Sequence, residues 1–265
     1  MRIALGVEYD GSAFHGWQRQ PGLRTAQGEL ERALSSIANE EGVKVYCAGR
    51  TDTGVHGLGQ VIHFDTHSER SEKAWIFGTN ALLPKDVSVT WSREVDDEFH
   101  ARKSALARHY RYIIVNDAVR PSVLRGHVTW HYFDLDADMM HEAAQHLVGE
   151  HDFSSFRSVQ CQSHSVHRHL EKISVKRQGK LIIVDVIANA FLHHMVRNIV
   201  GTLMTVGGGR QDVEWIIDVL EAKDRAAAAE TAPPYGLYLL AVRYPEQYDL
   251  PYDENGPLLA AGSTR

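Results

Sequence analysis

Residues 49–57, with the sequence GRTDTGVHG, bring together in one short segment the side chains of an acid–base site. The carboxylate of Asp52 follows the guanidinium of Arg50 by two positions and precedes the imidazole of His56 by four. The glycines of this segment permit positive φ angles and a close approach of a ligand to the backbone. The segment can therefore present Asp52 as a nucleophile or a general base, and both roles require an ionised carboxylate. A polar turn built on Asp and Gly is the simpler alternative.

Two arginines are candidates to keep Asp52 ionised. Arg50 lies on the same segment and can either pair with the carboxylate or point toward a substrate. Arg197 lies in residues 194–206, whose mostly apolar composition predicts a buried helix. A buried arginine requires a carboxylate partner, whereas a position at the exposed edge of the helix would not.

Other chemistries leave no recognisable pattern in the chain. No second carboxylate is identifiable that would oppose Asp52 as glycoside hydrolysis requires. The 16 histidines show no zinc-type spacing. The glycines at 207–209 follow a predicted helix, so they indicate a helix end rather than a phosphate-binding loop. We therefore predict an enzyme that uses no metal and no cofactor.

Two basic runs stand out in a chain of net charge −6. Residues 100–111 carry four permanent cations and no acid, and residues 154–169 carry two arginines and three histidines, again with no acid. Such runs are either solvated surfaces or local phosphate-binding sites. Tyr110 and Tyr112 alternate along a predicted strand and share one side of it. Core packing explains such a pair, but an aromatic ring beside cations is also what stacking on a nucleobase requires.

The elements that position these side chains alternate in the manner of an α+β fold. We expect a first lobe over residues 1–100, a second lobe over residues 101–244 and an irregular tail over residues 245–265. The predicted strands are 3–9, 43–48, 59–65, 87–94, 110–116, 128–133, 171–177, 180–189 and 237–244, and the predicted helices are 26–39, 72–80, 138–147, 194–206 and 213–221.

The composition is that of a globular protein, with 43% hydrophobic and 23% charged residues. Cys47 and Cys161 are far apart and without metal-type spacing, which is typical of a reducing compartment. The N-terminal residues resemble a strand rather than a signal peptide, and no apolar run reaches membrane-spanning length. We therefore expect a cytoplasmic protein.

Residues 48–57 (AGRTDTGVHG) resemble the active-site motif of the tRNA pseudouridine synthases. The resemblance covers nearly the whole chain. Each further match is only modestly specific, but their order along the chain is highly specific. They are residues 8–12 (EYDGS), 16–20 (GWQRQ), 99–102 (FHAR), 111–112 (RY), 152–157 (DFSSFR), 190–198 (AFLHHMVRN) and 236–239 (GLYL).

The resemblance implies an isomerase that converts uridine to pseudouridine at tRNA positions 38, 39 and 40. In that reaction the C1′–N1 bond breaks, the uracil turns, and C5 joins C1′. Asp52 would be the catalytic residue, either attacking C1′ or deprotonating C2′. Arg50 would extrude the uridine from its stack. Tyr110 would stack on the base and assist proton removal, and Arg197 would hold Asp52 ionised.

The resemblance also implies a two-lobed fold with a central, mostly antiparallel sheet, outer helices and an active-site cleft between the lobes. It implies a homodimer that binds tRNA across both subunits. The implied RNA-binding positions are Arg70, Phe99, His100, Ala101, Arg102, Lys103, Gln160, Cys161, Gln162, Ser163 and His164. Two positions depart from the family pattern. Thr53 replaces the usual alanine, and His164 replaces a frequent arginine, so its contact would depend on pH.

Two alternatives remain open on the sequence alone. A non-catalytic RNA-binding module with the same fold would bind tRNA without isomerising it. A glycoside-type hydrolase would release free uracil and leave an abasic site. The products formed from unmodified tRNA distinguish all three hypotheses.

Overall fold

The computed structural model describes residues 1–161, 163 and 165–253. Its described residues divide into two compact units: unit 1 holds Met1–Arg108 and Tyr238–Asp253, and unit 2 holds His109–Leu237. These boundaries differ from the expected lobes over 1–100 and 101–244. The basic run up to Arg108 stays with unit 1, and the last strand returns to unit 1. The pattern of a strand does not specify its pairing partner, so this return is not visible in the local sequence.

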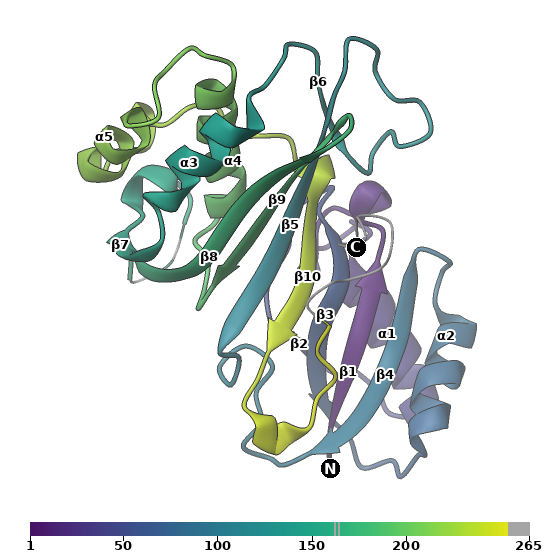
Figure 1. Ribbon diagram of the computed structural model, residues 1–265. Coiled ribbons are helices and arrows are strands. Elements are labelled where there is room, and N and C mark those ends of the chain that lie inside the picture. Colours follow the sequence, from purple (N-terminus) through teal and green to yellow (C-terminus); the bar gives the residue numbers. More distant parts are fainter. Residues whose placement is uncertain (162, 164, 254–265) are drawn as a thin grey trace, which may run out of the picture. The chain divides into compact units, whose positions relative to one another are not determined.

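The strand order in the sheet of unit 1 is β4 (Val87–Val95), β1 (Arg2–Tyr9), β3 (His56–Asp65) and β10 (Leu237–Arg243), and the short β2 (Tyr46–Cys47) also pairs with β3 (Figure 1). β1 pairs with β3 and β4 in the antiparallel sense, β2 is antiparallel to β3, and β10 is parallel to β3. The expected strand over 43–48 is therefore only two residues long.

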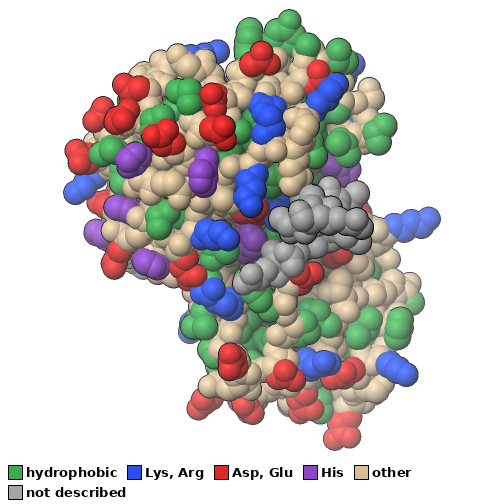
Figure 2. Space-filling model, viewed as in Figure 1, with side chains coloured by type: hydrophobic (Ala, Val, Ile, Leu, Met, Phe, Trp, Pro, Cys, Tyr) green, Lys and Arg blue, Asp and Glu red, His purple; other side chains and the backbone are tan. Residues whose placement is uncertain are grey.

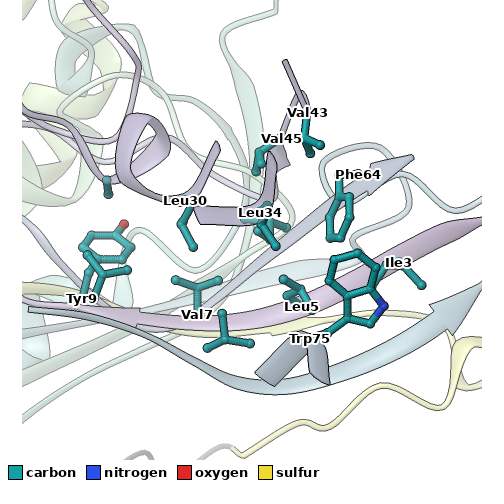
Figure 3. Close-up of a cluster of buried hydrophobic side chains, with 14 of the residues drawn as sticks. Ile3, Leu5, Val7, Tyr9, Leu30, Leu34, Val43, Val45, Phe64 and Trp75 are labelled. Carbon is teal, nitrogen blue, oxygen red and sulfur yellow. The ribbon is translucent and has the colours of Figure 1, made fainter. Parts of the chain in front are cut away.

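Helix α1 (Ala26–Ala38) covers the core of unit 1. It begins at Thr25, whose hydroxyl accepts a backbone N–H of the first turn, and it ends at Asn39 in the left-handed conformation, with φ 55°. Leu30 and Leu34 lie against the apolar side chains of β1 and β3 (Figure 3). This packing fixes β3, the strand into which the Asp52 segment leads.

Trp75 completes the same core from a second helical segment. The expected helix over 72–80 is present, but it contains a π-helical turn at Ala74–Gly78 before α2 (Thr79–Leu82). The Trp75 ring meets Phe64 of β3 edge to face, with ring centroids 5.2 Å apart.

The sheet of unit 2 is built around one long hairpin (Figure 1). The hairpin turns at Gly179, with φ 58°, at the position that the Gln-Gly pair predicts. The strand order is β5 (Ala107–Asn116), β9 (Leu181–Ala188), β8 (His167–Gln178) and β7 (Gly149–Asp152), and β6 (Thr129–His131) pairs with β5 in the parallel sense. Neither β7 nor its pairing with β8 is evident from the sequence pattern.

Three helices pack in unit 2: α3 (Ala137–Gln145), α4 (Met195–Gly207) and α5 (Trp215–Ala222). Most residues of α4 are buried, as its apolar composition predicts. The helix ends in the glycine run, where Gly209 has a φ of 68°. Short 3-10 turns connect the elements of both units: η1 (Gly11–Ala13), η3 (Ser154–Phe156), η4 (Arg225–Ala227), η5 (Pro234–Gly236) and η6 (Glu246–Tyr248).

The predicted α+β class is confirmed, with mostly antiparallel pairing. Within the described ranges, every helix is too short or too polar to cross a membrane. Charged side chains of both signs cover the visible face, and histidines gather over the part of unit 2 that α3, β7 and β8 form (Figure 2).

Candidate active site

The Asp52 loop, residues 48–55, connects β2 to β3, and buried side chains hold its first two residues. The carbonyl of Ala48 accepts a hydrogen bond from Nη2 of Arg108 at 3.1 Å. Gln60 of β3 is fully buried, and its Nε2 donates to the Gly49 carbonyl at 2.6 Å while its Oε1 accepts the Gly49 N–H at 3.3 Å. The Gln60 amide thus satisfies both backbone groups of Gly49, as a neighbouring strand would.

Thr51, one residue before Asp52, is fixed at three points. Its hydroxyl lies 2.7 Å from the Tyr9 hydroxyl, and its carbonyl accepts the Trp17 N–H at 3.0 Å. Gly16 packs against the same carbonyl: it has a φ of 81°, and a Cβ there would lie 2.9 Å from the Thr51 oxygen. Only glycine therefore combines this conformation with this close approach.

Asp52 begins the tight turn at the tip of the loop. Its carbonyl accepts the Val55 N–H at 3.1 Å, and Gly54 at the third position of the turn has a φ of 81°. The Asp52 side chain is partly exposed, and those of Arg50 and Thr53 are exposed. The loop therefore holds its backbone in place while it presents a carboxylate and a guanidinium outward.

His56 supports the exit of the Asp52 loop. The ring is buried, and its Nδ1 accepts the Gly11 N–H at 3.0 Å and lies 3.2 Å from an Asp10 carboxylate oxygen. The ring also stacks on Tyr238 of β10, with centroids 4.6 Å apart. Burial raises the pKa of the Tyr238 hydroxyl, and the negative charge of Asp10 raises it further.

The Cys47 thiol shows that two cations converge near the root of the loop. Burial raises its pKa to about 12, while Arg50 and Arg102 act in the opposite direction through their positive charges. Arg102 belongs to the first basic run. The Arg108 guanidinium bonds both the Ala48 carbonyl and the Arg102 carbonyl, so this run lies beside the Asp52 loop within unit 1, which the sequence order does not reveal.

Two of the predicted RNA-binding residues are buried supports. Phe99 and Ala101 have no exposed surface. The Phe99 ring packs against Tyr244, and Ala101 lies beneath the first basic run. The Ala101 carbonyl accepts from the Tyr244 hydroxyl at 2.6 Å, and its N–H donates to Nδ1 of His63 at 3.1 Å. The side chains of Phe99 and Ala101 therefore hold the run from below, and a contact of these two residues with RNA stays a prediction.

The cations of the same run do reach the surface. The side chains of Arg102 and Lys103 are exposed. The backbone N–H groups of these two residues donate to Nδ1 of the half-buried His100 at 3.1 and 3.4 Å. Burial lowers the pKa of His100, and the positive charge of Lys103 lowers it further. The neutral His100 ring can therefore accept both N–H groups and shape the turn that presents the two cations.

His63 completes the support of this run. Burial lowers its pKa to about 4, and the charges of His100 and Arg2 act in the same direction. The ring is therefore neutral near pH 7, as its acceptor role toward Ala101 requires. Tyr46 stacks on its outer side, with centroids 5.1 Å apart.

The remaining predicted RNA-binding residues lie apart from the basic run in sequence. Arg70 is exposed and donates to the Ile37 carbonyl at 3.3 Å. In the second run, Ser163 accepts from Nη2 of Arg168 at 2.8 Å. Gln160 is exposed, Cys161 and Ser163 are half-buried, and Gln162 and His164 lie outside the described residues.

Unit 2 carries the aromatic candidate, Tyr110, on β5. Its ring is 8% exposed and meets Phe191 edge to face, with centroids 4.9 Å apart. The residues on either side of Tyr110 bind Asp185 of β9. Nε of Arg111 lies 2.8 Å and Nε2 of His109 lies 3.0 Å from the same Asp185 carboxylate oxygen. Burial would raise the pKa of Asp185, but these hydrogen bonds outweigh it and lower the pKa. The contacts connect the strand of Tyr110 to β9.

Arg197 also belongs to unit 2, where the backbone beside α4 restrains it. Its Nε donates to the Ala232 carbonyl at 2.8 Å, and its own carbonyl accepts the Ala232 N–H at 3.1 Å. One turn later, a Cβ on Gly201 would lie 1.9 Å from the Glu230 carbonyl oxygen, so this segment packs directly on α4. The half-buried guanidinium is therefore held by backbone contacts.

A third acid-free stretch, residues 118–133, escaped the sequence prediction. It contains two arginines and two histidines, and three of its aromatic side chains are exposed: Trp130 at 42%, Tyr132 at 54% and Phe133 at 61%. Phe133 also lines a cavity of about 500 Å³ together with His131 and Arg210. The absence of acids among cations and aromatics was a signal that could have identified this stretch.

Comparison with known proteins defines the class of this protein. The profile of the family described as tRNA pseudouridine synthase matches residues 6–102 and 143–245. These ranges include the Asp52 loop, the first three residues of the basic run, and Arg197. The chain therefore belongs to the tRNA pseudouridine synthase family, which confirms the predicted resemblance and the activity that it implies, isomerisation of uridine to pseudouridine in tRNA.

Individual relatives match almost end to end. A protein of Shewanella sp. (strain W3-18-1) named tRNA pseudouridine synthase A is 58% identical over 97% of this chain and 98% of its own. A protein of Haemophilus influenzae (strain 86-028NP) with the same name is 57% identical over 97% and 96%. Among solved structures, a Cbf5–Nop10–Gar1 complex aligns with 89% of this chain and 48% of its own, at 13% identity and a TM-score of 0.39.

Proposed function

We propose that this protein isomerises uridine to pseudouridine at one or more of positions 38, 39 and 40 of tRNA, with Asp52 as its catalytic residue. The observation that carries the proposal is the Asp52 loop. Its backbone is fixed by Arg108 and Gln60 and its Thr51 hydroxyl by Tyr9, while Asp52 remains partly exposed. Such preorganisation is what a positioned nucleophile or base requires.

The reaction rearranges atoms without adding or removing any. The C1′–N1 bond of the uridine breaks, the uracil turns, C5 bonds to C1′, and the proton of C5 is exchanged for one at N1. Asp52 either attacks C1′ or takes a proton from C2′, and both routes need its carboxylate ionised. No metal or cofactor is needed to balance this isomerisation.

The other site residues have supporting roles in the proposal. Arg50, exposed on the same loop, helps to extrude the target base and occupies the space that the base leaves. Tyr110 stacks on the base and assists proton removal from C5. Arg197, whose guanidinium the Ala232 backbone orients, holds Asp52 ionised.

The RNA contacts involve local basic surfaces of an acidic protein. Arg102 and Lys103 are exposed beside the Asp52 loop and contact phosphates, with Arg70 and residues 160–164 as further positions. The protein acts in the cytoplasm as a homodimer that binds tRNA across both subunits. Light scattering tests the dimer: a mass of one chain at micromolar concentration contradicts it.

Release of tritium from unmodified tRNA labelled at uridine C5 tests the activity. We expect release by the wild-type protein and none by Asp52→Asn, which should still bind tRNA. Mapping of pseudouridine along the product identifies the positions modified. Free uracil among the products would support a hydrolase, and binding without release would support a non-catalytic RNA-binding module. Unchanged turnover by Asp52→Asn contradicts the assigned role of this residue.

A further inference from the structure

Arg108 is buried at 8% exposure, and its guanidinium bonds two separate segments of unit 1. Its Nε and Nη2 lie 3.4 and 3.1 Å from the Ala48 carbonyl oxygen. Its Nη2 also donates to the Arg102 carbonyl at 2.5 Å, and its Nη1 donates to the Ala105 carbonyl at 3.2 Å. One planar group thus holds three backbone carbonyls.

The two segments have different proposed roles. Ala48 is the first residue of the Asp52 loop, four positions before the carboxylate. Arg102 and Ala105 belong to the basic run, whose exposed cations Arg102 and Lys103 contact phosphates in the proposed function. Because the guanidinium is rigid, the Ala48 carbonyl cannot shift relative to the run without losing a charge-assisted hydrogen bond.

We propose that Arg108 is a positioning residue that couples the RNA-contacting run to the Asp52 loop, an inference that rests on the proposed function. Phosphate binding by Arg102 and Lys103 fixes the run, and the run fixes Ala48 through Arg108. The placement of Asp52 therefore depends on RNA engagement in the same unit. Arg108 acts through the loop backbone and does not itself touch the reacting atoms.

Gln60 provides the matched comparison. It also holds the root of the loop, through both backbone groups of Gly49, but none of its described hydrogen bonds goes to the basic run. Loss of Gln60 should therefore displace the loop without changing RNA binding. Loss of Arg108 should change both. This difference separates coupling from simple loop support.

The experiment compares Arg108→Lys, Gln60→Met and the control Arg177→Lys. Lysine keeps the charge of Arg108 but has only one nitrogen to replace three donors. Arg177 of unit 2 likewise donates to a backbone carbonyl, that of Leu135, at 2.5 Å. Each variant is measured by thermal unfolding, by tRNA affinity, and by the single-turnover rate of tritium release at saturating enzyme.

We expect Arg108→Lys to lower the single-turnover rate roughly 10- to 100-fold and to weaken tRNA binding about 3- to 10-fold. Gln60→Met should lower the rate by a similar factor with unchanged affinity, and Arg177→Lys should change neither. Wild-type protein without tritium release would mean that the proposed function itself fails. That outcome is distinct from an active wild type with an unaffected Arg108→Lys.

The coupling is overturned if Arg108→Lys keeps both its rate and its affinity, or changes only one of them. A rate loss that merely follows the unfolded fraction overturns it as well. If Arg108→Lys does not fold, Arg108→Gln, whose amide can still donate to Ala48, is measured in the same way. If neither variant folds, Arg108 is a residue of general stability and the proposal is rejected.

Discussion

The Asp52 loop of unit 1 and residues 118–133 of unit 2 differ in how they are held, although both carry exposed functional side chains. Tyr9, Gln60 and Arg108, all buried, bond the backbone or the threonine hydroxyl of the loop. In residues 118–133 buried supports lie along the second half, where Tyr112 contacts the Thr129 hydroxyl and Asn116 donates to the His131 and Phe133 carbonyls. The side chains of Val123 and Phe133 nevertheless expose 94% and 61% of their surfaces. In the Asp52 loop the buried supports bond the residues directly before the proposed catalytic carboxylate.

The difference follows from what each region must do. A displacement of about 1 Å at a reacting carboxylate can cost a factor of 100 in rate. Contacts to phosphates and exposed bases tolerate more movement, because long side chains and aromatic faces adapt to the nucleic acid. If the comparison holds, substitutions beneath the loop should reduce the rate, and substitutions in residues 118–133 should change affinity.

Gly16→Ala should have the largest effect. Its Cβ would lie 2.9 Å from the Thr51 carbonyl oxygen, so the residue before Asp52 must shift. We expect the single-turnover rate to fall by about 100-fold with unchanged tRNA affinity. Gly22→Ala is a matched control, because Gly22 has a similar φ of 73° and no atom within 4 Å of its Cβ position. Equal rates for the two variants would show that the loop does not need its fixed position.

His63 extends the comparison to the basic run of unit 1, which is held from below. Its folded pKa of about 4 lies below the ordinary 6.5, so the fold favours the neutral ring. In the unfolded chain His63 therefore binds a proton below pH 6.5, whereas in the folded chain it binds that proton only below about pH 4. The contribution of the neutral His63 to the free energy of unfolding is fully present above pH 6.5 and is lost as the pH falls through this window, by about 2 kcal/mol at pH 5.

Urea unfolding at pH 7.5 and pH 5.0 measures this loss. His63→Asn retains an acceptor for the Ala101 N–H and cannot titrate, so its stability should change less between the two pH values. The difference between the two proteins isolates His63 from the carboxylates, which titrate in both. An identical pH dependence would mean that His63 does not carry this loss.

The sequence predicted the α+β class, most strands and helices, and the loop that carries Asp52, because these depend on local patterns. It did not predict the return of β10 to unit 1, since strand pairing is set by tertiary packing. Phe99 and Ala101 were predicted to contact RNA because the family resemblance includes residues 99–102. Their apolar side chains are buried, and only their charged neighbours emerge.

The supports of the loop show the same limit. Gln60 and Arg108 lie 8 and 56 positions from Asp52, and neither has a spacing that suggests a contact with the loop. His56 was grouped with Asp52 because the two are close in sequence, but the strand directs its ring toward Gly11 and Tyr238. Proximity along the chain identified the loop, and only the fold identifies what holds it.

Tyr9→Phe should have a smaller effect than Gly16→Ala, because it removes one hydrogen bond and introduces no clash. The Tyr9 hydroxyl lies 2.7 Å from the Thr51 hydroxyl. Loss of one such bond is worth about 1 kcal/mol, so we expect the single-turnover rate to fall about fivefold. Tyr112→Phe is the control, since that hydroxyl lies 2.6 Å from the Thr129 hydroxyl in unit 2 and also donates to the Pro233 carbonyl at 2.7 Å. A larger rate loss in the control would place the sensitive contact in unit 2.

Arg125→Ala should have the smallest effect and tests residues 118–133 directly. The side chain is exposed in an acid-free stretch, so it can contact one phosphate of a bound tRNA. We expect affinity to fall about two- to threefold near physiological salt, with the salt dependence reduced by about one counterion and the single-turnover rate unchanged. Arg93→Ala, which removes an exposed arginine paired with Glu72, is the control and should leave affinity and salt dependence unchanged. A rate loss at saturating Arg125→Ala enzyme would mean that residues 118–133 also position reacting groups, and the contrast with the Asp52 loop would fail.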